Sequence, residues 1–270
     1  MRRKPPRYLE YWVFKVIKRK NAREIEMMRR AGKIAAAARD LAGKMVTVGA
    51  TTQSINKKVH DFILSHGAVP AFLGYNNFPA SICTSVNEEV IHGIPSARKL
   101  VQGDLVSIDI GAAKGGFIGD CAATFIAGEG SAETERLIKV TRECFFEGLK
   151  YARTGYRVSD ISRAIQKCAE ENGYSVVREY VGHGVGSKMH EPPEVPNFVE
   201  TPRKKADPRL LPGMTLAVEP MVNAGKAAIR VLDDGWTVVT ADGKNSAHYE
   251  NTILITESEP EILTVCEGMQ

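Results

Sequence analysis

The most restrictive feature of this 270-residue sequence is a unit of two helices followed by strands, which occurs twice. Hydrophobic spacing predicts an amphipathic helix over residues 22–45, a second helix from Thr51 or Thr52 to Gly67, and strand-like sequence after it. Two more helices are predicted in SAETERLIKVTRECFFEGLKYA and VSDISRAIQKCAEENG, again ahead of strand-like segments. A chain built in this way is expected to fold as two similar α+β halves.

An alignment of Gly49 with Gly155 tests this recurrence position by position. It pairs apolar residues with apolar residues and one helix-ending glycine with another: Ile55 with Ile161, Val59 with Ile165, and Gly67 with Gly173. Any two amphipathic helices would match in part, but two matched glycine ends favour a duplication. Duplicated halves usually meet around a central cleft, where polar residues from both halves could converge.

The composition is that of an ordinary soluble globular protein, with 43% hydrophobic and 25% charged residues. No apolar run approaches the roughly 18 residues that a membrane span needs. The segments WVF and VI near the N-terminus are split by Lys15, and no small-residue cleavage site follows, which argues against a signal peptide. Five cysteines without a CxxC pair fit a reducing compartment. We therefore expect a cytoplasmic protein without membrane contact.

Positive charge is concentrated at the N-terminus. Residues 1–20 contain eight Lys or Arg and a single acid, whereas the chain as a whole carries only +4, so the remainder is mildly acidic. Such an arm is commonly a solvated tail. Alternatively, it could contact a polyanion such as ribosomal RNA.

Four acidic residues lie in apolar, strand-like sequence, where carboxylates are costly to bury unless they are paired or bound to a cation. They are Asp109 in LVSIDIG, Asp120 in FIGDCAATF, Glu219 in MTLAVEPM and Glu250 in HYENTILI. Any one of them could be a hydrogen-bonded structural acid, but four together, with few bases nearby, favour a cation site. Four carboxylates balance two divalent ions, and a neutral histidine could be a fifth ligand. The sequence also lacks a GxSxG motif and a P-loop, so it predicts a dinuclear metallohydrolase.

The stretch VGHGVGSKMHEPP contains two histidines, His183 and His190, separated by seven residues. Its glycines predict irregular backbone rather than a helix or strand. Spacing alone leaves open whether the two histidines bind one metal or have separate catalytic roles. Among the other histidines, His248 is expected on the same side of a strand as Glu250, where a structural role is favoured.

Five segments occur in a characteristic order: VNEEVIHGIP, SIDIGAAKGGFIGDCAATF, VGHGVGSKMHEPP, LAVEPMV and YENTILIT. With them the chain closely resembles the type I, bacterial methionine aminopeptidases from about residue 22 to residue 265. The resemblance implies the pita-bread α/β fold, in which pseudo-twofold halves, here roughly 22–128 and 129–265, share a central antiparallel sheet with helices on the outside. A single catalytic domain, 21–270, would follow the basic arm, 1–20.

The same resemblance implies roles for individual residues. Two divalent ions, of cobalt, manganese, iron(II), zinc or nickel, would be held by Asp109, Asp120, His183, Glu219 and Glu250. His92 and His190 would be catalytic groups that touch substrate without binding metal, and Glu219 would also carry a proton. The methionine side chain would lie in an apolar pocket formed by Phe72, Tyr75, Phe78, Cys83, Met189 and Trp236. Two residues depart from the family pattern: Met189 stands where many relatives have phenylalanine, and Asn251 stands where histidine is common.

The implied reaction is removal of the N-terminal methionine from nascent proteins and peptides when the second residue is small, through attack by a metal-bridging hydroxide on the first peptide bond. The partners would be nascent polypeptide N-termini, with ribosome contact through the arm, and the protein would be a monomer. One alternative is an Xaa-Pro-type aminopeptidase of the same fold. Another is a non-catalytic pita-bread protein that interacts with ribosomes or RNA.

Overall fold

The computed structural model describes residues 16–200 and 207–266, so residues 1–15 of the predicted basic arm lie outside the described residues. These described ranges contain four α-helices: α1 (Ala22–Met45), α2 (Thr52–Ser65), α3 (Ala132–Leu149) and α4 (Val158–Glu171). None of the helices in the described ranges is both long and apolar enough to cross a lipid bilayer.

The centre of the molecule is a nine-stranded sheet in which every pairing is antiparallel. Its strands run in the order β1-β4-β5-β14-β9-β7-β8, with β2 on β4 and β15 on β14. Their bounds are β1 (Val69–Pro70), β2 (Cys83–Val86), β4 (Leu105–Lys114), β5 (Phe117–Ile126), β7 (Gly182–Gly184), β8 (Glu191–Val195), β9 (Thr215–Val218), β14 (Glu250–Leu254) and β15 (Glu261–Ile262).

Two three-stranded sheets make up the rest of the sheet structure in the part of the chain that is described. One has the order β13-β10-β6, with β6 (Ser175–Val176), β10 (Met221–Asn223) and β13 (Ser246–His248). The other has the order β11-β12-β3, with β3 (Glu89–Ile91), β11 (Ile229–Val231) and β12 (Val238–Thr240).

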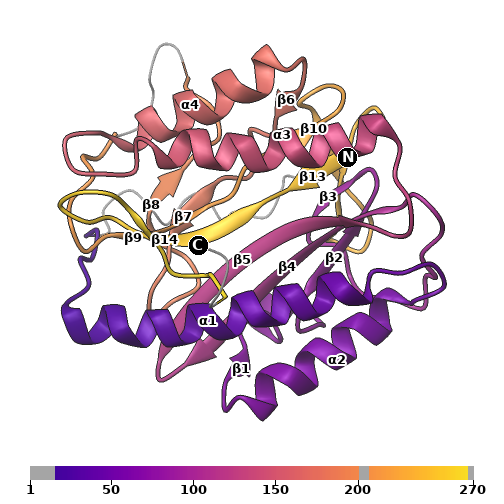
Figure 1. Cartoon of the computed structure of the whole chain (residues 1–270), viewed down its shortest axis with the longest axis horizontal. Helices are drawn as coiled ribbons and strands as arrows, with labels where there is room; N and C mark the ends of the chain where they lie inside the picture. The colour runs from indigo at the N-terminus through magenta and orange to yellow at the C-terminus, as the bar shows by residue number, and fades with distance from the viewer. Residues whose placement is uncertain (1–15, 201–206, 267–270) are drawn as a thin grey trace.

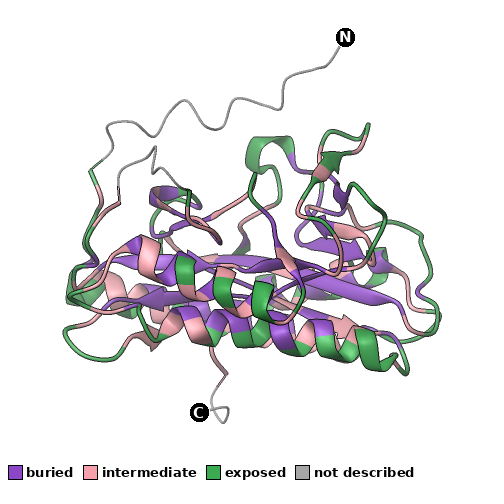
Figure 2. Ribbon diagram, turned by 90° about the horizontal axis from the view of Figure 1, so that it is seen from above, coloured by how far each residue is buried: buried purple, intermediate pink, exposed green. Residues whose placement is uncertain are grey.

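The helices form one layer against the large sheet. Figure 1 shows α1 and α2 as one pair and α3 and α4 as a second pair, both in front of the strands. In the view from above, the helices lie along one side of the buried strands, and loops and short strands lie along the opposite side (Figure 2). The mixed α/β fold with an antiparallel central sheet and outer helices, which the sequence predicted, is therefore confirmed.

Local sequence explains where the helices begin and end. The side chain of Thr51 accepts a hydrogen bond from the Ser54 N–H at the start of α2, and Ser131 does the same with the Thr134 N–H at the start of α3. The glycines predicted to end α2 and α4, Gly67 and Gly173, have φ angles of 63° and 82°. Glycine adopts this left-handed conformation without the steric penalty that other residues meet.

The predicted recurrence is visible in the burial of the helices. Its aligned pairs, Ile55 with Ile161 and Val59 with Ile165, are all completely buried. The residues of α1 and α2 pack against β4 in one apolar core, and those of α3 and α4 pack with β9 in another. Each half therefore buries its own helix pair against a shared sheet.

The prediction of irregular backbone for the glycine-rich stretch was wrong around His183. Gly182–Gly184 forms β7, which pairs with both β8 and β9. A Cβ added at Gly182 would lie 2.4 Å from the Ala217 carbonyl oxygen, and one at Gly184 would lie 2.4 Å from that of Pro192. The glycines thus let neighbouring backbones approach closely within the sheet.

Candidate metal centre

One polar side chain comes from each of five neighbouring strands at the middle of the large sheet. Along the order β4-β5-β14-β9-β7, these residues are Asp109, Asp120, Glu250, Glu219 and His183. Glu219 directly follows the last residue of β9, and the other four lie within their strands. Residues up to 141 positions apart along the chain are therefore side by side.

The strand register directs these side chains to one face. Ala122 on β5 is paired with both Asp109 and Glu250, and Asp120 lies two residues before it. Because paired residues, and residues two apart on a strand, face the same side, the three carboxylates converge around this small alanine.

Ala217 has the corresponding place in the second half. It is paired with His183 on β7, and Glu219 lies two residues after it. The alanine side chain leaves space in front of it for the imidazole and the carboxylate. Ala122 on β5 and Ala217 on β9 thus each leave space for the polar side chains at one end of the same cluster.

The carboxylates are crowded and buried. Burial raises the pKa of Asp120 to about 7, and burial followed by repulsion from Asp120 raises the pKa of Asp109 well above its usual value. Burial, and then repulsion from Asp120 and the other acids, also raises the pKa values of Glu219 and Glu250 well above their usual range. Such a cluster keeps its negative charges near neutral pH only with a cation among them.

His183 presents a nitrogen lone pair to this cluster. Its Nδ1 lies 2.9 Å from the Gly184 carbonyl oxygen, which only an N–H can satisfy, so Nε2 is left without a proton. Nε2 is 3.8 Å from Asp120 Oδ2 and 3.5 Å from Glu219 Oε1. Burial lowers the pKa of His183 to about 4, which keeps the ring neutral.

Several polar atoms here lack a hydrogen-bond partner. Of the six buried side-chain atoms of this kind among residues 16–200 and 207–266, three belong to this cluster: Asp109 Oδ1, Asp120 Oδ1 and Glu250 Oε1. A fourth, His248 Nε2, lies 3.7 Å from Glu250 Oε2. An unsatisfied buried polar atom costs about 1–3 kcal/mol. Oxygen atoms with a few imidazole nitrogens, all lacking other partners, fit divalent transition metals.

The two histidines that were predicted to be catalytic, His92 and His190, flank the cluster. His92 follows β3 with φ 60°, and its ring contacts the edges or faces of Tyr180 and Trp236 at centroid distances of 5.5 and 6.3 Å. Burial lowers the pKa of His92 to about 4. The His190 ring lies 4.2 Å from the His183 ring.

The imidazole of His190 is also held by Tyr75, on the side away from His183. Its Nδ1 lies 2.7 Å from the Tyr75 hydroxyl, and the two rings are stacked at 5.4 Å. The hydrogen bond leaves Nε2 as the atom that a substrate could meet.

The residues predicted to surround the methionine side chain also gather. Phe72, Phe78, Cys83 and Trp236 belong to one apolar cluster, and the rings of Phe78 and Trp236 meet edge to face at 5.0 Å. Met189 joins them, because a Cβ on Gly111 would lie 2.8 Å from its Cε and 2.7 Å from Phe72 Cε1. Cys83 is the strand partner of Asp109, so the apolar cluster borders the carboxylates. Tyr75 bonds through its backbone to Phe72 and Phe78, and through its hydroxyl to His190.

Asn251 faces away from the cluster. Its side-chain oxygen accepts hydrogen bonds from Arg39 Nη1 and Thr264 Oγ1, on the side of the sheet opposite to Glu250. This departure from the family pattern therefore does not alter the immediate surroundings of Glu250.

Sequence reasoning expected His248 beside Glu250 but did not predict its approach to Asp109. His248 is 2% exposed, and its donor atom, with one from Asp109 and one from Glu250, forms a group whose members lie within 4.8 Å of one another. A second such group consists of Asp120, His183 and Glu250. The available signal was the position of His248 two residues before a strand-borne acid.

Fold and polar cluster together define a metal-dependent peptidase. The model of metallopeptidase family M24 matches residues 26–257, and the chain belongs to that family. Within it, a methionine aminopeptidase of Clostridium perfringens is 52% identical over 246 residues, covering 91% of this chain and 98% of that protein.

Solved structures agree with this assignment. The crystal structure of methionine aminopeptidase from Rickettsia prowazekii has a TM-score of 0.89 to this chain at 41% identity, covering 93% of this chain and 100% of that one. The resemblance drawn from the five sequence segments, and the pita-bread fold that it implied, are therefore confirmed.

More distant structures share the fold alone. Prolidase from Pyrococcus furiosus has a TM-score of 0.74 at 22% identity, covering 92% of this chain but only 66% of that one. The prolidase is thus a longer chain, a third of which has no counterpart in this alignment.

Proposed function

We propose that this chain is an aminopeptidase that removes the N-terminal methionine of nascent proteins and peptides when the second residue is small. The observation that supports this most strongly is the cluster of four carboxylates and a neutral histidine on five adjacent strands. It occurs in a chain that aligns over 98% of a methionine aminopeptidase.

Two divalent ions would be held by the five residues of this cluster, Asp109, Asp120, His183, Glu219 and Glu250. Support comes from the chemistry of the donors, since Asp109, Asp120 and Glu250 each have a buried oxygen atom without a hydrogen-bond partner. The pKa values of all four carboxyl groups are raised without a cation. Glu250 belongs to both three-residue groups, which suits a ligand shared by two ions. Ions held by these residues would lower the pKa of a bound water towards neutral pH and would polarise the scissile carbonyl.

The surrounding residues would orient the substrate and move protons. His190, fixed through Nδ1 by Tyr75, would donate a hydrogen bond from Nε2 to the carbonyl oxygen as negative charge develops there. His92, held between Tyr180 and Trp236, would lie at the scissile nitrogen. Glu219 would transfer a proton to the departing amine.

The methionine side chain would pack in the apolar cluster of Phe72, Phe78, Cys83, Met189 and Trp236. An unbranched thioether packs well against aromatic rings and sulfur atoms. The cluster borders Asp109 through the strand pairing of Cys83, which places a bound side chain beside the carboxylates.

The decisive experiment is a metal-titrated assay on Met-Xaa peptides with varied second residues. We expect activity that depends on manganese, cobalt or iron(II), cleavage of Met-Ala-Ser, and poor cleavage when the second residue is large. Cleavage of Ala-Pro in preference to Met-Ala-Ser would favour an Xaa-Pro peptidase instead. Neither activity, with less than one metal per chain, would favour a non-catalytic protein.

We further propose that residues 1–20 form a basic arm on a single catalytic domain, 21–270, that the protein is a cytoplasmic monomer, and that the arm contacts ribosomal RNA. The arm concentrates eight cations in 20 residues of an otherwise mildly acidic chain. Co-sedimentation with ribosomes at low and high salt tests the contact. Equal pelleting of the full chain and of a chain lacking residues 1–15 would refute it.

A further inference from the structure

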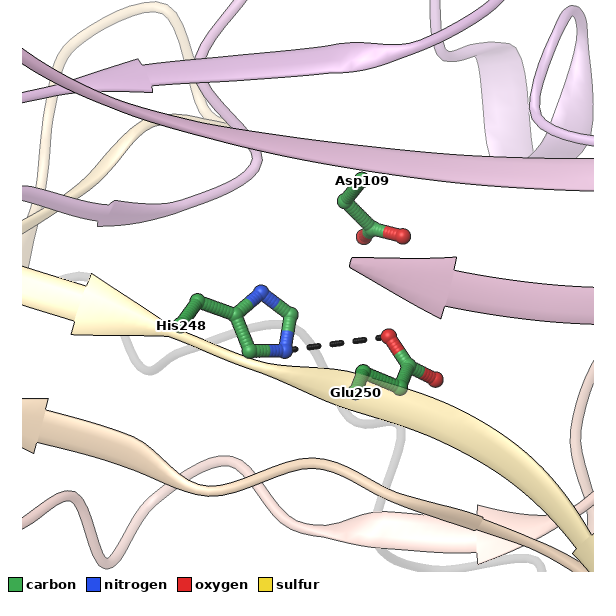
Figure 3. Close-up of side chains that lie close together, drawn as sticks. All are labelled: Asp109, His248 and Glu250. Carbon is green, nitrogen blue, oxygen red and sulfur yellow. Dashed lines mark ion pairs between the residues drawn. The ribbon is translucent and has the colours of Figure 1, made fainter. Parts of the chain in front are cut away.

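His248 lies inside the polar cluster without a role in the proposed reaction. It ends β13, and the chain passes through Tyr249 directly into β14, whose first residue is Glu250. His248 therefore belongs to a small sheet and Glu250 to the large one, yet both side chains turn toward the same point. Figure 3 shows the imidazole and the Asp109 carboxylate directed toward Glu250.

The backbone of His248 is fixed on both sides. Its N–H donates to Thr124 Oγ1 at 2.9 Å, and its carbonyl oxygen accepts from the same hydroxyl at 2.9 Å. Thr124 lies on β5, four residues beyond Asp120. The imidazole is thus positioned relative to the strand that carries Asp120, as a preformed ligand would be.

The Nε2 atom of His248 is buried and has no hydrogen-bond partner. It lies 3.7 Å from Glu250 Oε2, which is too far for a hydrogen bond. Two atoms bound to one transition-metal ion at about 2.1 Å each can be up to about 4.2 Å apart, so the separation suits a shared ion. His183 has almost the same separations, 3.8 and 3.5 Å, from Asp120 and Glu219.

We propose that His248 is an additional metal ligand, which holds a divalent transition-metal ion together with Asp109 and Glu250. This inference rests on the proposed dinuclear site. One imidazole then serves each cation position, since His183 belongs to the group with Asp120 and His248 to the group with Asp109, and Glu250 is common to both. Imidazole at the Asp109 position favours cobalt, iron(II), nickel or zinc over magnesium and calcium there.

The test compares His248→Gln with wild type and two other variants. His183→Gln removes the proposed ligand of the other position. His60→Gln is a matched control, because its Nδ1 bonds Ser81 Oγ at 2.8 Å in a partly buried site on α2. Each metal-free protein is titrated with Co²⁺ by calorimetry, and X-ray absorption on the loaded protein counts imidazoles per cobalt.

We expect one imidazole per cobalt, averaged over two ions, in wild type and His60→Gln, and half that number in His248→Gln and His183→Gln. His248→Gln should bind one of its two ions about 10-fold or more weakly. An unchanged imidazole count in His248→Gln overturns the proposal, even if affinity falls, because His248 would then act only through Glu250.

A second measurement serves if His248→Gln does not fold. In a crystal structure of cobalt-loaded wild type, Nε2 should lie about 2.1 Å from an ion, and a separation beyond about 3 Å overturns the proposal. The peptide assay stays separate: protein that binds cobalt through His248 but cleaves no Met-Xaa peptide would refute the proposed function and leave the ligand assignment standing.

Discussion

Lys20 and Glu191, 171 residues apart in sequence, form a buried ion pair. Lys20 Nζ lies 2.8 Å from Glu191 Oε2, and the two side chains are only 5% and 6% exposed. Glu191 also accepts a hydrogen bond from the Lys188 N–H. The end of the predicted arm is therefore tied to the turn that carries Met189 and His190.

Lys20→Met should destabilise the protein, because it leaves the Glu191 carboxylate buried without its cation. Loss of one partner of a buried pair costs about 3 kcal/mol or more. Urea unfolding of metal-free protein measures the change, with Lys18→Met as the control, since Lys18 is exposed. A Lys20→Met variant as stable as Lys18→Met would mean that the pair contributes nothing. Adding Glu191→Gln to Lys20→Met should restore part of the loss.

The stability of metal-free protein should fall as the pH rises through about 7, which is the pKa of Asp120 in the folded state. In the folded state Asp109, Asp120, Glu219 and Glu250 have pKa values above those of unfolded chains, so folding binds protons and loses stability as these groups ionise. Below about pH 6.5 the neutral buried histidines oppose this trend, since they release protons on folding.

Thermal unfolding in chelator at several pH values from about 6.5 upward measures this dependence, at about 1.4 kcal/mol per pH unit for each proton involved. Asp120→Asn should flatten the decline, and added Mn²⁺ should abolish it. A stability that is independent of pH in this range would contradict the raised pKa values.

His190→Ala should lower turnover of Met-Ala-Ser by about 100-fold or more, because it removes a hydrogen-bond donor to the developing oxyanion. Metal content, measured by atomic emission, should stay at the wild-type value. Asp120→Asn and Glu250→Gln should instead lose turnover and metal together. If His190→Ala lost its metals, the separate roles assigned to His183 and His190 would be wrong. Tyr75→Phe, which removes the 2.7 Å bond to Nδ1 but keeps the imidazole, should have a smaller effect than His190→Ala.

Gly111→Ala should raise KM for methionine peptides more than it lowers kcat. The new Cβ would press on Phe72 Cε1 and Met189 Cε, at 2.7 and 2.8 Å, and so narrow the apolar cluster. Steady-state kinetics with Met-Ala-Ser gives both constants. A second substitution, Met189→Ala, should recover part of the KM because it vacates the contested space. Equal KM values for Gly111→Ala and wild type would show that this cluster does not hold the methionine side chain.

Local patterns were sufficient to predict the helices and their ends. Thr51 and Ser131 are residues that cap helices through their own side chains, and Gly67 and Gly173 end helices through a conformation that glycine adopts readily. The strand-borne acids were also visible, because a carboxylate is exceptional in apolar β sequence. The structure places these acids on adjacent strands, and their role as ligands stays a prediction.

Features that depend on distant partners could not be predicted. The glycines beside His183 are suited equally to a loop and to a crowded sheet, and only the carbonyl oxygens of Ala217 and Pro192 decide between them. Lys20 read as one charge of an exposed arm because Glu191 is remote in sequence. The approach of His248 to Asp109 could not be predicted, because Asp109 comes from another strand.

The position of β14 in the sheet has a consequence for the protein while it is being synthesised. This strand lies between β5 and β9, yet it is translated after both of them. Until Glu250–Leu254 has left the ribosome, the two halves have no strand to join them and the cluster lacks Glu250. A chain translated only to residue 249 therefore lacks both the strand that closes the sheet and one of the proposed metal ligands.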